Sequence, residues 1–348
     1  YVSLCTTNLA DPTIADGSTA FDVKLWNGND TQRDITGLGF SPDLVWIKQR
    51  SGTALHSLQD TVRGATKNLV PNDTQSEGTE TAYLNAFLSN GFSIGTSSTV
   101  NDGSSTYVGW TWDGGTSTVS NTDGSITSSV RANPSAGFSV VSYTGSSSAV
   151  TVGHGLNAAP QMIIVKDRDN SYNWQVAHIG IGADESLLLN AGDAKADYNA
   201  WNNTRPTSSL FSLGAGTLGV NTNGADLIAY CFAPVEGYSA FGSYTGNGSA
   251  DGPFVFTGMR PRWLMVKSSS NSGEHWLILD TERDPHNLAD ATIYANLSNA
   301  EAEAAVLGID ILSNGFKCKG TNAGANASGY TYVYAAFASH PFKTARAR

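Results

Sequence analysis

Six histidines are the side chains of this sequence best suited to acid–base or metal chemistry near neutral pH. They are His56, His154, His178, His275, His286 and His340. None belongs to an H-E-x-x-H motif, and no two have the spacing of metal ligands on one element. We therefore interpret them as loop or structural histidines, and for His178 we expect a hydrogen bond to a loop.

Carboxylates offer a second kind of chemistry, because a glycosidase needs two of them flanking the scissile bond. The candidate pairs are Asp167 with Asp169 and Asp280 with Asp284. However, an Asp-x-x-Arg pattern recurs at 60–63 and 280–283. The recurrence favours a structural ion pair that fixes a loop over an active site.

Calcium is the alternative that the carboxylates leave open, since it prefers oxygen ligands on loops. Such ligands are offered by Asp16 with Asp22 and by Asp167, Asp169 and Asn170, although no EF-hand pattern is present. Residues 214–219 match G-x-G-x-x-G but lead into a predicted strand, which indicates a turn and not a dinucleotide site. We predict a non-enzymatic protein with no catalytic residues, no metal ligands and no cofactor, with calcium as the alternative.

The composition indicates the fold class and excludes two kinds of partner. Only 14% of the 348 residues are charged, against about 25% in an average globular protein. Together with 37 Gly and many aromatic residues, this is typical of an all-β protein with many turns. The net charge of −10 argues against nucleic acid, and no apolar run reaches the roughly 18 residues of a membrane span. We therefore predict no nucleic-acid partner and no membrane insertion.

An ordered series of marks recurs three times and predicts three copies of one module. The clearest mark is a proline six residues before a lysine, with an apolar run between them. It occurs at 42–48 (PDLVWIK), 160–166 (PQMIIVK) and 261–267 (PRWLMVK). Such a run is typical of a buried strand whose first residue needs no backbone donor.

Further marks follow each lysine in the same order. Twelve or thirteen residues on stand Asp60, His178 and Asp280. Near the end of each copy an asparagine recurs in a turn: Asn101, Asn221 and Asn326. A closing strand follows each of these turns, at 107–112, 227–232 and 332–337. The histidine makes the middle copy the divergent one.

We predict three tandem antiparallel β-sandwich modules, jelly-roll-like and decorated by short helices. The segments are an N-terminal piece at 1–19 that ends a preceding domain, module 1 at 20–115, a Ser/Thr/Gly-rich linker at 116–136, module 2 at 137–233 and module 3 at 237–348. The linker could equally be a solvent-exposed hairpin. Because the second junction is much shorter, we expect module 1 to be the more mobile one.

Short helices are expected in equivalent loops of the first and third copies. One is predicted at 80–87, and the other begins at Ser298, where Glu301 completes a capping box before three alanines.

Four aromatic residues of the middle copy lie outside the repeated strands: Tyr172, Trp174, Tyr198 and Trp201. Exposed rings present flat apolar faces to sugars and to protein partners. These four are therefore the candidate ligand-binding residues, with packing on their own module as the alternative.

Several segments resemble the tandem modules of uncharacterised tail-associated virion structural proteins of tailed bacteriophages, a group frequent in marine phages. They are PDLVWIKQR, GHGLNAAPQMIIVKDR, FGSYTGNGSADGPFVFTGMRP and YVYAAFASHPFKTARAR, and the resemblance runs from about residue 20 to residue 348. The group has no defined biochemical activity, so the resemblance implies no catalytic residues.

The resemblance implies a virion component, with other virion proteins as partners. We expect a tail fibre or tail-tip protein that attaches to a host cell-surface glycan or protein, and a homo-oligomer, with a trimer favoured. The alternatives are a capsid fibre or decoration protein of the phage head and a polysaccharide-binding, tailspike-like protein.

Overall fold

The computed structural model describes residues 13–216 and 219–338, which form antiparallel sheets. In this part of the chain the only α-helix is α1 (Ser98–Asn101), and two short 3₁₀ turns lie at Gly17–Thr19 and Ala305–Leu307. The predicted all-β class is confirmed.

Each third of the chain forms one large sheet in which the closing strand lies between the first strand and the strand of the proline–lysine mark. In module 1 the order is β1 (Phe21–Asn27), β9 (Thr106–Trp112), β3 (Leu44–Gln49) and β4 (Ser57–Asp60). In module 2 it is β10 (Thr118–Asn121), β11 (Ser128–Asn133), β12 (Phe138–Thr144), β19 (Asp226–Phe232), β14 (Met162–Asp167), β15 (Gln175–His178), β16 (Glu185–Leu188) and β17 (Ala196–Asp197). In module 3 it is β20 (Ser239–Thr245), β28 (Thr331–Ala338), β22 (Pro261–Ser268), β23 (Leu277–Asp280), β24 (Ala291–Tyr294) and β25 (Ala302–Glu303).

A small sheet accompanies each large one. Its strands are β2 (Arg33–Thr36), β8 (Gly91–Ile94) and β7 (Leu84–Leu88) in module 1, β13 (Val150–Gly153) and β18 (Leu210–Leu213) in module 2, and β21 (Phe254–Phe256), β27 (Gly315–Cys318) and β26 (Ile309–Leu312) in module 3. Module 1 also has the short pair β5 (Lys67–Asn68) and β6 (Gly78–Thr79). An apolar core unites residues of the large and the small sheet in every module. The sandwich with jelly-roll connectivity stays a prediction.

Two local expectations are corrected by strand pairing. The helix predicted at 80–87 is wrong, because β7 pairs with β8 as a hairpin. The helix predicted from Ser298 is also wrong, because β25 pairs with β24. Of the two alternatives for residues 116–136, the structure shows the hairpin: β10 and β11 extend the large sheet of module 2. The segment 1–12 lies outside the described residues.

The closing strands are buried on both faces, which explains their nearly continuous apolar sequences. In β28 the side chains alternate: Val333, Ala335 and Phe337 face one core, whereas Tyr332 and Tyr334 face another. One of these cores belongs to module 3 alone. The other contains residues of all three modules and is the centre of the molecule.

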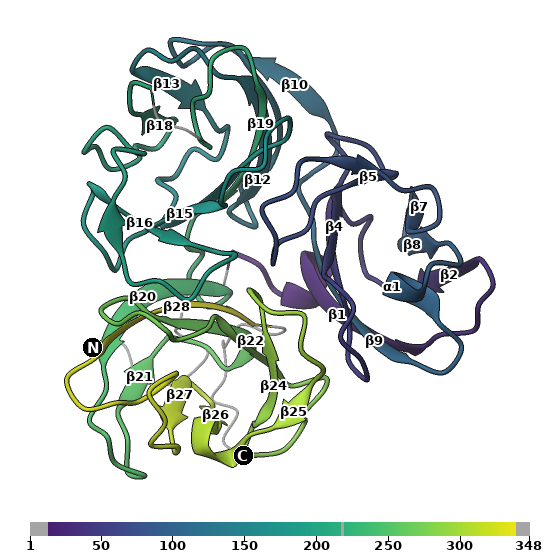
Figure 1. The fold of residues 1–348 in the computed structure, drawn as a ribbon, viewed down its shortest axis with the longest axis vertical. Helices are drawn as coiled ribbons and strands as arrows, with labels where there is room; N and C mark the ends of the chain where they lie inside the picture. Colours follow the sequence, from purple (N-terminus) through teal and green to yellow (C-terminus); the bar gives the residue numbers. More distant parts are fainter. Residues whose placement is uncertain (1–12, 217–218, 339–348) are drawn as a thin grey trace, which may run out of the picture.

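The three modules surround this shared core in an approximately threefold arrangement (Figure 1). Three rings near the ends of the closing strands meet there: Trp112, Phe232 and Phe337. Their centroids are 6.2 Å (Trp112–Phe232), 5.9 Å (Trp112–Phe337) and 5.9 Å (Phe232–Phe337) apart. Module 1 thus packs against both neighbours, contrary to the expectation that it is the loosely attached one.

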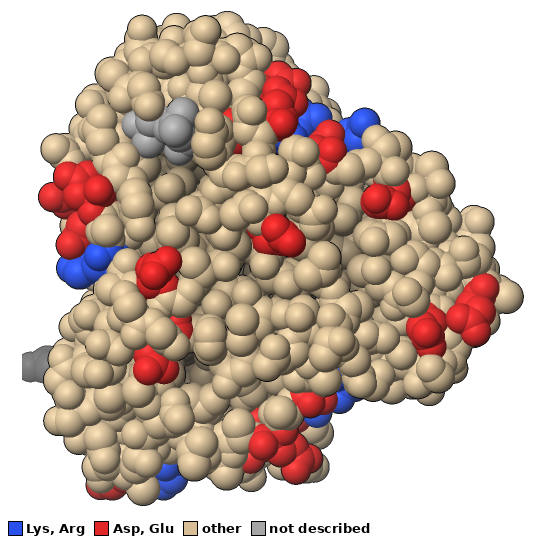
Figure 2. All heavy atoms as spheres, in the orientation of Figure 1, with Lys and Arg blue, Asp and Glu red and all other residues tan. Residues whose placement is uncertain are grey.

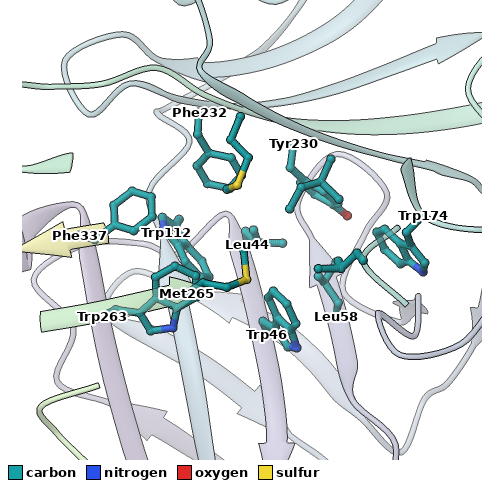
Figure 3. A pocket seen from close by; sticks show the side chains of 13 residues that line it. Leu44, Trp46, Leu58, Trp112, Trp174, Tyr230, Phe232, Trp263, Met265 and Phe337 are labelled. Carbon is teal, nitrogen blue, oxygen red and sulfur yellow. The ribbon is translucent and has the colours of Figure 1, made fainter. Parts of the chain in front are cut away.

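The space left beside these rings is small. A void of ≈ 20 Å³ lies among Trp112, Phe232, Phe337 and other apolar side chains of all three modules (Figure 3). That volume has room for about one water molecule. The place where the three modules meet is therefore a packed core and not a ligand site.

Truncating one ring of this core tests its importance. We expect Phe337→Ala to lower the free energy of unfolding by about 3–5 kcal/mol, because it opens a cavity between three modules. Phe256→Ala is the matched control, since this ring is 66% exposed and its loss changes stability by no more than about 0.5 kcal/mol. Urea denaturation measures both; equal effects would contradict the shared core.

Candidate functional site

The lysine of the repeated mark is a structural group in all three modules. Lys48, Lys166 and Lys267 are fully buried. Each Nζ donates at 2.6 Å to the carbonyl of the following residue: Gln49, Asp167 and Ser268 respectively. A second bond reaches Gly52 (3.0 Å), Asn170 (2.9 Å) and Gly192 (3.4 Å) respectively. Burial lowers the pKa of each lysine to about 8. The first two ammonium groups hold the turns after β3 and β14, whereas Lys267 joins the end of β22 to Gly192 of module 2.

The repeated asparagine fixes the other end of each module. Asn101, Asn221 and Asn326 are fully buried. Each side-chain amide donates to two carbonyls, at 2.6 and 2.8 Å for Asn101, 2.6 and 2.9 Å for Asn221, and 2.8 and 3.0 Å for Asn326. Each Oδ1 accepts a backbone N–H from the turn that follows the first strand. The mark therefore ties two loops together in every copy.

The repeated Asp-x-x-Arg pattern is a buried ion pair, as the sequence indicates. The Asp60–Arg63 and Asp280–Arg283 pairs have N–O distances of 2.5 and 2.6 Å with no side-chain exposure. Each arginine also binds a glutamate of its own module, Glu77 at 3.1 Å and Glu301 at 2.9 Å. The carboxylate of Asp280, a candidate for glycosidase chemistry, is thus paired with Arg283 and holds a loop.

Those two glutamates join neighbouring modules. Glu77 of module 1 binds Arg168 of module 2 at 2.9 Å, and Glu301 of module 3 binds Arg50 of module 1 at 2.7 Å. Burial alone would raise the pKa of Glu77, but the hydrogen bond from Arg168 and the charge of Arg63 lower it. Both carboxylates are therefore held ionised between two guanidinium groups.

An equivalent backbone hydrogen bond joins each pair of neighbouring modules. Glu77 N donates to Arg168 O (2.7 Å), Lys195 N to Ser269 O (2.9 Å) and Glu301 N to Arg50 O (2.7 Å). The three bonds run from module 1 to 2, from 2 to 3 and from 3 to 1. At the interface of modules 2 and 3 no arginine–glutamate pair accompanies the bond, because Ser269 stands where the other modules have arginine.

The histidine of the middle copy is explained by the side chain that the neighbouring module places beside it. Asp60 accepts from Tyr230 Oη at 2.7 Å, and Asp280 accepts from Trp110 Nε1 at 3.0 Å. The equivalent position of module 3 is Ala335, which has no side-chain donor. His178 therefore replaces the aspartate and contacts the carbonyl of Tyr334 at 3.0 Å.

An aromatic N–H reaches into the next module from the residue before β4, β15 and β23. His56 Nε2 lies 3.1 and 3.0 Å from the carbonyls of Tyr294 and Leu297 in module 3. Trp174 Nε1 donates to Val70 O of module 1 (3.0 Å), and Trp276 Nε1 donates to Leu188 O of module 2 (2.8 Å). Each module is thus anchored in one neighbour and receives an anchor from the other.

Two of the four candidate aromatic residues are buried, one of them by the alternative of packing within its own module. Trp174 is fully buried as an anchor between modules, and Trp201 is buried in the core of module 2, where its Nε1 donates to Ser186 Oγ at 2.7 Å. Tyr172 is partly exposed and Tyr198 is 38% exposed. The structure therefore does not assemble a binding surface from these four rings.

The predicted carboxylate and calcium ligands have local partners. Asp167 is fully buried, and its Oδ1 accepts the backbone N–H groups of Asp169 (3.0 Å) and Asn170 (2.9 Å). Asp284 accepts the backbone N–H of Asp290 at 2.7 Å. Across residues 13–216 and 219–338 no three His, Cys, Asp or Glu side chains come together as a metal site.

Two hollows on the outer surface are small. One of ≈ 150 Å³ lies beside His56, Glu80 and Tyr83, and one of ≈ 120 Å³ lies beside His178 and Arg205. Pockets for small molecules usually measure about 300–1,000 Å³. Figure 2 shows a surface on which charged side chains are sparse and scattered, so this face carries no broad charged patch.

Among the described residues, the most exposed aromatic rings lie where the sequence analysis placed no site. Phe254 and Phe256 of β21 are 47% and 66% exposed, whereas Val255 between them is buried. The β21 strand is the edge of the small sheet of module 3. Aligning this strand with its counterparts in the other copies would have revealed the pair, because no ring occupies either position there.

Comparison with known proteins identifies a family whose description names no function. Residues 16–341 match a family described as a domain of unknown function, DUF7483. The chain belongs to this family. No curated protein matches the chain. Among the described residues, no helix has the length and apolar character needed to cross a membrane.

Acid is expected to weaken the contacts between modules. His56 Nδ1 accepts from Trp46 Nε1 at 2.8 Å, and His178 Nδ1 accepts from the backbone N–H of Gly180 at 3.0 Å, so both rings are neutral with the proton on Nε2. Burial lowers the pKa of His56 to about 3 and that of His178 to about 4. Between pH 6.5 and these values the unfolded chain binds more protons, so stability is present above pH 6.5 and is lost as the pH falls.

Urea denaturation at pH 7.5 and pH 5 measures this effect. We expect a loss of about 2 kcal/mol for each of the two rings, because the ordinary histidine pKa is about 6.5. His178→Asn keeps an N–H donor but cannot titrate, so it should reduce the loss between the two pH values by about 2 kcal/mol. An unchanged free energy of unfolding between the two pH values would contradict the assignment.

Proposed function

We propose that this chain is a non-enzymatic virion structural protein of a tailed bacteriophage, a tail fibre or tail-tip component that attaches to the host cell surface. The resemblance of its repeated segments to tail-associated proteins supports the location. The observation that carries the attachment role is the exposed ring pair Phe254 and Phe256 on a scaffold whose repeated polar groups hold its own loops and interfaces.

Three features of the scaffold support this role over an enzymatic one. The repeated Asp, Arg and Lys side chains are buried and paired with groups of the chain itself. The central void measures only ≈ 20 Å³ and is lined by apolar side chains. The loops at the outside are joined to three packed cores, so they can vary without loss of the fold.

The partners follow from the same proposal. Other virion proteins bind this chain on one side, and a host cell-surface glycan or protein is bound on the other. A homo-oligomer, with a trimer favoured, stays a prediction of the resemblance. The capsid fibre or head decoration protein is the alternative, and location on the particle separates the two.

Immunogold labelling of intact virions tests the proposal. We expect an antibody against this chain to label tail tips or fibres in electron micrographs, and the purified chain to reduce phage adsorption when it is added to host cells first. Label spread over the head, without reduced adsorption, would contradict the attachment role and favour decoration. An unrelated protein of the same net charge added at the same concentration is the control.

A further inference from the structure

The three copies can be compared residue by residue at the edge of their small sheets. In each, a buried aliphatic residue of the edge strand pairs with a buried phenylalanine of the next strand: Ile35 with Phe92, Val152 with Phe211 and Val255 with Phe316. These pairs fix the alignment of β2, β13 and β21. Differences at the flanking positions are therefore not required by the fold.

The flanking positions carry aromatic rings in one copy only. They are Asp34 and Thr36 in module 1, Thr151 and Gly153 in module 2, and Phe254 and Phe256 in module 3. The first two modules show that this strand forms and packs without an aromatic ring at either position. The two phenylalanines of module 3 add no support that the fold needs, and a large apolar side chain in water requires another explanation.

The two rings form one surface. Alternate residues of a strand point to the same face and lie roughly 6.5 Å apart along it. A Cβ atom at Gly315 would lie 3.1 Å from Phe254 Cε2, and one at Gly258 would lie 3.8 Å from Phe256 Cζ. Both rings therefore rest against glycines, and we call the surface made by Phe254 and Phe256 the ring platform.

The size of the ring platform decides what it can bind. Two phenylalanine side chains exposed to this extent present roughly 200 Å² of apolar area. A stable protein interface buries about 800 Å² on each partner. The other exposed large apolar side chain of module 3 among the described residues is Val306, which lies in the 3₁₀ turn Ala305–Leu307 and not on this strand. The platform thus has the area of one or two sugar rings, and it is too small for a second copy of the chain.

The open edge of the sheet does not account for the rings. Pro253 accepts from Cys318 N at 3.2 Å and Thr257 N donates to Asn314 at 3.0 Å, so the backbone groups of Phe254 and Phe256 point away from β27. However, β2 and β13 are sheet edges as well. The outer side of β13 is covered, because Ile126 bridges Val152 and Thr151 N donates to Ser125 Oγ at 2.8 Å. The edge strand β2 carries no ring. Because a sheet edge of this kind occurs without rings in module 1, recognition through ring faces fits better than addition of a partner strand.

The rim of the platform is polar and close to neutral. Lys317 stands opposite Phe254 in the sheet and is paired with the exposed Asp251. Such groups exchange hydrogen bonds with hydroxyls, and their charges cancel. Sugar C–H groups carry partial positive charge, which suits the negative face of an aromatic ring. The geometry points to Phe254 and Phe256 as the binding platform for a neutral saccharide, an inference that rests on the proposed attachment function and names its ligand class and its site.

Two double variants separate ring stacking from simple apolar contact. Phe254→Leu with Phe256→Leu keeps apolar area but removes the ring faces, whereas Phe254→Trp with Phe256→Trp keeps ring faces. The probes are immobilised neutral hexasaccharides of glucose, galactose, mannose and N-acetylglucosamine, with affinity measured by biolayer interferometry. We expect the unaltered chain to bind at least one of them, the Leu variant to bind it roughly tenfold or more weakly, and the Trp variant to retain binding.

Rebuilding the ring pair on another module tests saccharide binding independently. Asp34→Phe with Thr36→Phe, made in the Leu variant, rebuilds the ring pair on β2 of module 1 and should restore saccharide binding. Val306→Ala is the control for loss of an exposed apolar side chain elsewhere in module 3, and it should bind as the unaltered chain does. Absence of binding to every hexasaccharide, or equal binding by the Leu variant, would overturn the ring platform.

Phage adsorption distinguishes this inference from the proposed function. If the Leu variant blocks adsorption as well as the unaltered chain, the attachment role stands and the ring platform is overturned. If the unaltered chain binds a hexasaccharide through the rings but blocks no adsorption, the ring platform stands and the attachment role fails.

Discussion

The contact of Trp112, Phe232 and Phe337 around one centre is the constraint on which the other features of this molecule depend. Each ring comes from a closing strand that is buried on both faces, with one face in its own module and one in the shared core. A module taken alone would expose the inner face of its large sheet to water. Because that face is apolar, the three modules stabilise one another, and their order around the centre is fixed.

Polar contacts then specify how the modules meet. Buried ion pairs contribute little net stability, but they disfavour arrangements in which a charge loses its partner. Glu77 and Glu301 act in this way at two interfaces, and the third uses His178 and backbone bonds instead. The asymmetry means that the modules are not interchangeable. It also leaves each copy free to differ at its outer surface, and the ring platform is found in one copy only.

Much of the fold could be predicted from the sequence, because the repeated marks report local needs. Lys48 and Asn101 donate to carbonyls of their own module, and their positions recur at the same place in each copy. The packing of modules around one core could not be predicted, since a residue such as Trp174 has the same sequence signature whether it faces solvent or a neighbour. The four predicted ligand-binding rings do not form one surface for the same reason, because sequence alone does not distinguish a buried ring from an exposed one. Phe254 and Phe256 become visible as a pair only when β21 is placed beside β2 and β13.

Differential scanning calorimetry of the chain tests the shared core most directly. If the three modules depend on one core, unfolding is a single transition in which the calorimetric enthalpy equals the van't Hoff enthalpy for the whole chain. Two or three separate transitions, or a calorimetric enthalpy two to three times the van't Hoff value, would show modules that unfold independently and would contradict the account.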